Sequence, residues 1–174
     1  MKKWYMVTLV GRDRRGIVAG VTEALFEGRC NLGEASMVRL GGNFATMLMV
    51  EFDGDTHALE DMLRPVSGRL GLRCHVDEIE AGLHRHVEPD VRISVYGADR
   101  AGIVAEVTGA LAEAGLNILN LETDIGGTEG NPIYIMHLDG VAEQGVDTLR
   151  EVLETLSREK NVEARLVEND LLMG

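Results

Sequence analysis

The chain has 174 residues, of which 45% are hydrophobic and 26% are charged, a composition typical of a water-soluble globular protein. No apolar run approaches the roughly 20 residues that a membrane-spanning helix requires, so we expect a cytoplasmic protein without a membrane partner. The formal net charge of −12 and the lack of a basic patch exclude direct binding to DNA or RNA, which depends on Lys and Arg side chains that neutralise phosphates.

The sequence contains one unit twice. The stretch GRDRRGIVAGVTEAL, which starts at Gly11, recurs as GADRAGIVAEVTGAL from Gly97, and the two stretches agree at most positions. A long-period repeat predicts two domains, at 1–82 and 90–174, joined by a linker at 83–89. Because domains of about 85 residues bury only a modest fraction of their surface, we expect homo-oligomerisation or docking of the copies to add stability.

In the first copy, patterns typical of strands and helices alternate along the chain. The predicted elements are a strand at 5–10, a helix from 17 to about 28, strands at 32–40 and 44–52, a helix at 59–70 and a strand at 72–76. The sequence Gly41-Gly42-Asn43 between the second and third strands is a strong signal for a hairpin turn.

The second copy repeats this order. The predicted elements are a strand at 91–95, a helix at 103–111, strands at 117–125 and 133–138, a helix at 146–156 and a strand at 162–166. The two central strands are joined by a longer loop, GGTEGN, which Pro132 follows at the start of the next strand.

The order βαββαβ predicts the α+β class and a ferredoxin-like fold in each copy. Right-handed crossovers place both helices on one face of an antiparallel sheet, with the second and fourth strands at its edges. The open edge of the second strand needs a partner, and the duplicate copy is the nearest candidate. Cys30 and Cys74 belong to opposite edges of this sheet, too far apart for a disulfide.

The repeated loop before the first helix is the strongest candidate for a binding site. It carries Asp13 and Gly16 in the first copy, and Asp99 and Gly102 in the second. Unpaired N–H groups at a helix start favour a carboxylate or phosphate, the glycines leave room for a ligand at the backbone, and an aspartate suits an ammonium group. Together these features favour a free amino acid. The alternative is that the aspartates cap the helix and the glycines only permit a tight turn.

A second pair of recurring polar residues, Asn31 and Asn117, comes just before or at the start of the edge strand. An amide side chain at this place could bind both the carboxylate and the amine of a ligand. Asparagine also adopts the left-handed conformation that often ends a helix, which is a purely structural role. The sequence leaves both interpretations open.

No set of residues suited to catalysis or metal binding stands out. His84 and His86 have no cysteine or carboxylate set beside them at the spacing of a structural metal site. Neither Cys30 nor Cys74 can be matched with an activating histidine. We therefore expect no enzymatic activity, no metal and no cofactor.

The motif D-R-x-G-I-V, followed by a helix and then by N-L or N-I at the next strand, resembles the ACT domain. This domain is a small-molecule-sensing module that often controls amino-acid metabolism. The resemblance covers essentially the whole chain as two tandem copies, and two-copy chains of this length resemble the glycine cleavage system transcriptional repressor family. One departure is that many such loops have proline before the glycine, where this chain has Arg15 and Ala101.

The resemblance implies that the ligand is held by the loop and by the residues that open the second strand. The corresponding positions are Asp13, Arg14, Gly16, Ile17, Asn31 and Leu32 in the first copy, and Asp99, Arg100, Gly102, Ile103, Asn117 and Ile118 in the second.

The resemblance further implies a non-enzymatic protein that senses a small amino acid such as glycine or serine. The ligand would lie at a domain interface and would change the affinity for a protein partner, such as a DNA-binding regulator. The alternative is a regulatory subunit of an enzyme of amino-acid metabolism, since similar tandem modules precede phosphatase or deformylase domains.

Overall fold

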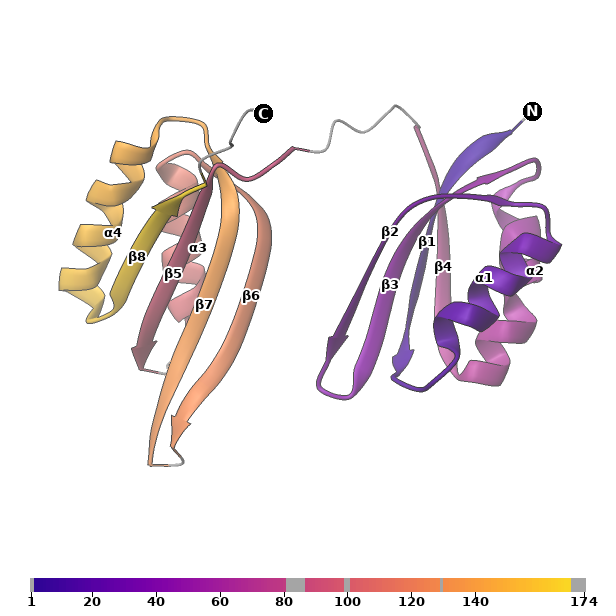
Figure 1. The fold of residues 1–174 in the computed structure, drawn as a ribbon, viewed down its shortest axis with the longest axis horizontal. Helices are drawn as coiled ribbons and strands as arrows, with labels where there is room; N and C mark the ends of the chain where they lie inside the picture. Colours follow the sequence, from indigo (N-terminus) through magenta and orange to yellow (C-terminus); the bar gives the residue numbers. More distant parts are fainter. Residues whose placement is uncertain (1, 81–86, 99–100, 129, 170–174) are drawn as a thin grey trace. The chain divides into compact units, whose positions relative to one another are not determined.

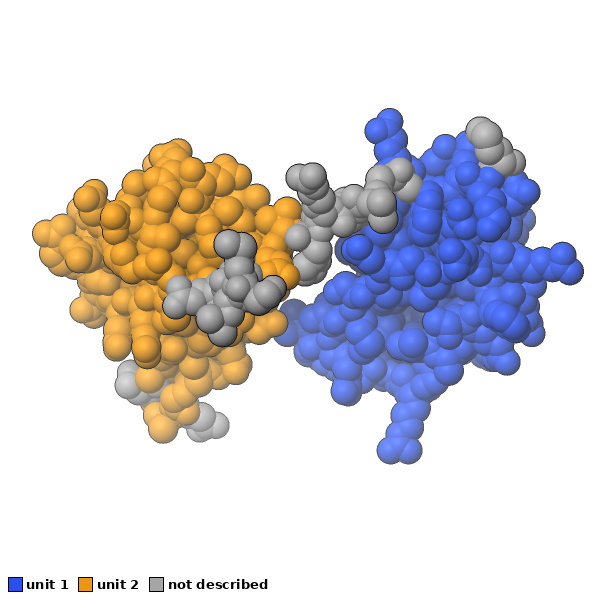
Figure 2. Space-filling view, turned by 45° about the horizontal axis from the view of Figure 1, so that its top comes forward, with its two compact units in different colours: residues 1–84 blue, residues 85–174 orange. Residues whose placement is uncertain are grey.

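The computed structural model describes residues 2–80, 87–98, 101–128 and 130–169. The chain divides into two compact units, unit 1 at residues 1–84 and unit 2 at residues 85–174 (Figure 2). Each unit is a four-stranded antiparallel sheet with two helices (Figure 1).

Unit 1 has the predicted order βαββαβ. Its elements are β1 (Lys3–Arg12), α1 (Ile17–Glu27), β2 (Asn31–Leu40), β3 (Asn43–Phe52), α2 (Thr56–Leu70) and β4 (Leu72–Ile79). The strands lie in the order β2-β3-β1-β4, so the second and fourth strands form the edges, as the sequence predicts.

Unit 2 repeats this arrangement with the strand order β6-β7-β5-β8. Its elements are β5 (Val91–Ala98), α3 (Ile103–Glu113), β6 (Leu116–Thr128), β7 (Asn131–Ala142), α4 (Val146–Lys160) and β8 (Glu163–Glu168). The prediction of two ferredoxin-like α+β domains is thus confirmed. The hairpin between β6 and β7 is longer than predicted, because Gly127 pairs with Pro132 and Thr128 with Asn131.

The core of each unit lies between one face of the sheet and the two helices that cover it (Figure 1). Alternate side chains of the central strands point to the helices, and the helices present apolar residues at intervals of three or four. The buried residues of the first strand and helix are Tyr5, Val7, Leu9, Ile17, Val21 and Leu25 in unit 1, and Val91, Ile93, Val95, Ile103, Val107 and Leu111 in unit 2.

The two cysteines are free thiols. Cys30 lies just before the edge strand β2, whereas Cys74 lies on β4 at the opposite edge of the sheet, as the sequence predicts. Partial burial raises the pKa of both thiols, which lowers the fraction of reactive thiolate near neutral pH.

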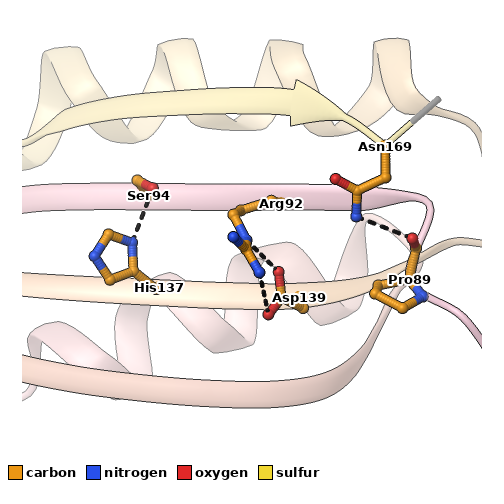
Figure 3. Close-up of polar contacts among 6 residues, drawn as sticks. All are labelled: Pro89, Arg92, Ser94, His137, Asp139 and Asn169. Carbon is orange, nitrogen blue, oxygen red and sulfur yellow. Dashed lines mark hydrogen bonds and ion pairs between the residues drawn. The ribbon is translucent and has the colours of Figure 1, made fainter.

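The helix-free faces of the two sheets differ in chemistry. In unit 2, Arg92 on β5 donates two hydrogen bonds to Asp139 on β7, at 2.6 and 3.1 Å, and Ser94 lies 2.9 Å from Nδ1 of His137 (Figure 3). In unit 1 the pair at the position of Arg92 and Asp139 is Met6 and Met49. These groups satisfy one another across neighbouring strands, so we assign the polar pairs of unit 2 to the stability of its sheet.

The pair of Arg92 and Asp139 makes the stability of unit 2 depend on pH. Its hydrogen bonds lower the pKa of the Asp139 carboxyl and raise the pKa of Arg92. A carboxyl whose pKa is lowered by folding stabilises the fold above its unfolded pKa, and this contribution is lost as the pH falls through its folded pKa. We expect the melting temperature of the Asp139→Asn variant to fall less than that of the wild type between about pH 5 and pH 3.

Thermal unfolding monitored by circular dichroism across this pH range measures the difference. Glu154→Gln, which removes an exposed carboxyl from α4, serves as the control and should follow the wild type. Parallel pH profiles for Asp139→Asn and the wild type would contradict the assignment.

Candidate functional site

The loop between β1 and α1 is fixed by its backbone. The N–H group of Asp13 donates to the carbonyl of Gly42 at 3.0 Å, which joins the loop to the turn between β2 and β3. Gly16 has a φ of +84° at the N-cap of α1, and its counterpart Gly102 has a φ of +87° before α3. A Cβ built on either glycine would meet nothing within 4 Å, so this left-handed backbone is what requires glycine.

The first turn of α1 presents backbone donors to this loop. The first helical hydrogen bond runs from the N–H group of Gly20 to the carbonyl of Gly16, at 2.9 Å. The turn at Arg15 and Gly16 directs one N–H group of the first helical turn towards the carbonyl of Arg14, but among the described residues no well-aligned backbone hydrogen bond uses the N–H groups of Ile17, Val18 or Ala19. These groups and the helix dipole favour an anionic ligand at this place.

Asp13 is paired with Arg39, which lies near the end of the neighbouring edge strand β2. The guanidinium reaches Oδ2 of Asp13 through Nε at 2.7 Å and through Nη2 at 2.5 Å. The capping interpretation of Asp13 is therefore wrong, because Gly16 is the N-cap of α1 and no side chain caps it. Instead, Asp13 and Arg39 place one negative and one positive group beside the helix start.

A hollow of about 450 Å³ lies against this loop in unit 1. Its lining residues come from the loop, the first turn of α1 and the ends of β2 and β3, and they are Asp13, Arg14, Arg15, Gly16, Ile17, Val18, Ala19, Met37, Arg39 and Phe44. Its volume falls in the range typical of small-molecule sites, which is about 300–1,000 Å³. The hollow thus combines three guanidinium groups, one carboxylate and an apolar wall.

The structure places the predicted loop residues together in this hollow. Asp13, Arg14, Gly16 and Ile17 all line it. The Ile17 side chain is buried in the core, as is that of Ile103 in unit 2, so each isoleucine offers the loop only its backbone. Sequence reasoning missed Arg39, Met37 and Phe44, although the Gly41-Gly42 turn places Arg39 opposite Phe44, which in turn pairs with Gly11.

Asn31 and Leu32 lie away from this hollow. Asn31 pairs with Glu51, and Glu51 pairs with Trp4 near the start of β1, whereas the loop follows the end of β1. A single unit therefore does not bring Asn31 and Asp13 into one site. Both residues that open β2 are exposed and remain accessible to another molecule.

The expectation that the asparagines end a helix in the left-handed conformation is wrong. Arg29 has the positive φ of +58° after α1, and Gly115 has a φ of +82° after α3. In each copy the left-handed residue that ends the helix comes two residues before the asparagine. Asn31 is therefore the first residue of β2, and Asn117 lies in β6.

Unit 2 differs from unit 1 at the corresponding site. Asp99 and Arg100 lie outside the described residues. The place that Arg39 occupies in unit 1 belongs to Ile125 in unit 2, because Ile125 pairs with Tyr134 and Tyr134 with Gly97. Ile118 is half-buried on β6 near Asn117. The duplicated chain therefore carries the arginine of the loop site on one copy and an aliphatic side chain on the other.

Two further findings concern the described part of the chain. No helix in it is long and apolar enough to cross a membrane. No three of its His, Cys, Asp and Glu side chains are grouped as a metal site would require. His84 and His86, considered as metal ligands from the sequence, lie outside the described residues.

Comparisons with known proteins agree with the fold. A curated UPF0237 protein, YjhC, from Lactococcus lactis is 40% identical over 72 residues, which are 41% of this chain and 83% of that protein. An unknown protein from Galdieria sulphuraria matches with a TM-score of 0.76 and 25% identity, over 97% of this chain and 99% of the other.

A candidate glycine cleavage system transcriptional repressor of known structure shares the fold at 16% identity, with a TM-score of 0.72, over 97% of this chain and 99% of its own. The family model of the ACT domain matches residues 4–77, and a second ACT domain model matches residues 91–159. ACT domains indicate a regulatory role that depends on binding a small molecule. The chain belongs to the ACT domain family and carries two ACT domains in tandem.

Proposed function

We propose that this protein is a non-enzymatic regulator that senses a small amino acid, such as glycine or serine, in the hollow beside the loop of unit 1. The observation that carries the proposal is the pairing of Asp13 with Arg39 opposite the amides of the first turn of α1. A zwitterion needs an acceptor for its ammonium group and donors for its carboxylate, and both lie within one hollow of suitable size.

In the proposed complex, the ligand carboxylate receives hydrogen bonds from the amides of Ile17, Val18 and Ala19 and from Arg39. The described side-chain contacts of Asp13 use only its Oδ2, so Oδ1 is the acceptor that we assign to the ammonium group. The side chain of Arg39 is 69% exposed and can turn to the ligand without unfolding the loop. Arg14 adds positive charge at the rim of the hollow.

We propose that Asn31 and Leu32 contribute to the binding site of a second copy of the chain. The edge strand β2 is exposed along its whole length, and an unpaired strand edge favours pairing with another strand. In an antiparallel pair of two β2 strands, the start of one strand lies beside the end of the other. A homodimer of this kind would bring Asn31 and Leu32 of one protomer to the Arg39 end of its partner.

Unit 2 has a parallel set of proposed contacts, consisting of Asp99, Arg100, Gly102, Ile103, Asn117 and Ile118. Ile125 in place of Arg39 removes one donor for a carboxylate, so we expect unit 2 to bind the amino acid more weakly than unit 1.

The proposed output is a change in affinity for a protein partner, such as a DNA-binding regulator, in the cytoplasm. The net charge of −12 disfavours direct contact with nucleic acid, which supports a route through another protein. Effector and partner are then reciprocally coupled, so each changes the affinity of the other by the same factor.

Isothermal titration of the full chain with glycine, serine and the other proteinogenic amino acids tests the proposal. A ligand of about five heavy atoms gains at most about 1.5 kcal/mol per atom, so we expect a dissociation constant of roughly micromolar at best. Saturable heat with one or two small amino acids, together with a raised melting temperature, is the expected result. No heat and no thermal shift across the whole set would contradict it.

A further inference from the structure

A groove runs between the two helices of unit 2. It has a volume of about 660 Å³ and lies between α3 and α4, which cover the same face of the sheet (Figure 1). Its apolar lining comes from Ala110 on α3, from Ala114 at the C-cap of α3, and from Val152 and Leu156 on α4. The small alanines leave the space open, and nothing in the amino-acid-sensing proposal uses this groove.

The corresponding place in unit 1 is filled. Gly28 takes the position of Ala114, and Met62 takes the position of Val152. A Cβ built on Gly28 would lie only 2.1 Å from Sδ of Met62, so this long side chain occupies the space between α1 and α2. The Met62 sulfur also lies 3.8 Å from Sγ of Cys30. Two copies of one fold therefore differ in whether the groove between their helices is closed by a side chain.

The rim of the groove in unit 2 is acidic. Glu113 and Glu151 border it together with Glu106 and Glu159, and the one basic lining residue is Lys160, which pairs with Glu106 at 3.4 Å. In unit 1 the positions of Glu106 and Glu159 are held by Gly20 and Arg69. The positions of Glu113 and Glu151 are held by Glu27 and Asp61, so the open groove shares two acidic positions with the closed one and adds two more.

We propose that this groove is the docking surface for a basic amphipathic helix of a partner protein. A helix that lies in a groove presents apolar residues at positions i, i+3, i+4 and i+7, and these would meet the half-buried Ala110 and Val152 above the buried Ala114 and Leu156. Lys or Arg side chains on both flanks of that helix would meet the glutamates of the rim. A second copy of this chain is disfavoured as the occupant, because its net charge of −12 repels an acidic rim.

Binding of designed peptides to the full chain tests the proposal by fluorescence anisotropy. The probe is a labelled peptide of about 18 residues, or five helical turns, with Leu and Ala on one face and Lys on both flanks. A scrambled peptide keeps the composition and charge but loses the apolar face, and a third peptide has Glu in place of Lys. We expect the probe to bind at least about tenfold more tightly than either comparison peptide.

Two variants of the protein test separately the apolar floor of the groove and its acidic rim. Ala114→Gly combined with Val152→Met copies the closing side chain of unit 1 and leaves the rim charge unchanged, so probe affinity should fall about tenfold or more. Glu113→Gln combined with Glu151→Gln keeps the floor, so affinity should fall and depend less on salt. Glu154→Gln removes one acidic charge of α4 outside the groove and should bind like the wild type.

Far-UV circular dichroism verifies that each variant is folded, and the rim variant tests the proposal independently if the floor variant unfolds. Equal binding of probe and scrambled peptide, or full affinity in both groove variants, would overturn the proposal. A change of oligomeric state in the floor variant, measured by sedimentation, would instead identify a second copy as the occupant and also overturn it. Arg39→Ala should leave probe binding unchanged, which separates this surface from the proposed amino-acid site.

Discussion

Replacing Arg39 with alanine is expected to weaken the binding of the amino-acid effector by about tenfold to a hundredfold. A hydrogen bond to a charged group contributes about 1.5–3 kcal/mol, and the substitution removes such a donor from the ligand carboxylate. It also leaves Asp13 without the guanidinium that approaches its Oδ2 to 2.5 Å, so the uncompensated carboxylate repels that of the ligand. Titration calorimetry with the amino acid that binds the wild type measures the loss.

The duplicated unit offers a matched control. Ile125 has the register position of Arg39 in unit 2, so Ile125→Ala should leave the affinity of the unit 1 site unchanged. Arg39→Lys retains the charge but not the planar fork of donors, and it should fall between the wild type and Arg39→Ala. Wild-type affinity in Arg39→Ala would remove Arg39 from the site and leave only the loop amides.

The second large effect is on stability. Leu59 on α2 and Leu149 on α4 have no exposed surface and occupy the same place in the two cores. Truncation to alanine removes buried methyl groups and leaves a cavity, which costs about 3 kcal/mol. We expect Leu59→Ala and Leu149→Ala each to lower the free energy of unfolding of its own unit by about this amount, as measured by urea denaturation of the full chain.

The same positions provide the control for packing. Leu59→Met and Leu149→Met keep the side-chain volume, so each should cost less than about 1.5 kcal/mol. If the alanine variants were as stable as the methionine variants, the two residues would not be central to their cores.

The fold was predictable because each copy shows hydrophobic periods that agree with its strands and helices. Leu59, Leu63 and Val66 recur at helical spacing, and all three are buried on α2 as predicted. The length of the β6–β7 hairpin was not predicted, since the glycines of GGTEGN indicate a loop by local propensity. Pairing of Gly127 with Pro132 extends the ladder through that segment, which shows tertiary context overriding local preference.

The loop of the candidate site was predictable from the sequence, but the residues that other strands bring to the loop were not. Asp13 and Gly16 lie only three residues apart in sequence, whereas Arg39 reaches Asp13 only through the register of β2, β3 and β1. The helix-ending interpretation of Asn31 is wrong because the helix end is closed by Arg29, whose N–H group bonds to the carbonyl of Phe26 at 2.9 Å. Interactions set by backbone closure and strand register do not leave a local pattern in the sequence.

The most direct test of the proposed sensing site is an NMR titration of the ¹⁵N-labelled chain with glycine and serine. The account predicts saturable shifts of the backbone amides of Ile17, Val18 and Ala19, together with the Nε–H resonance of Arg39, because these donors surround the hollow beside Asp13. If glycine or serine shifted resonances elsewhere on the chain but left these four groups unchanged, the result would contradict the proposed site.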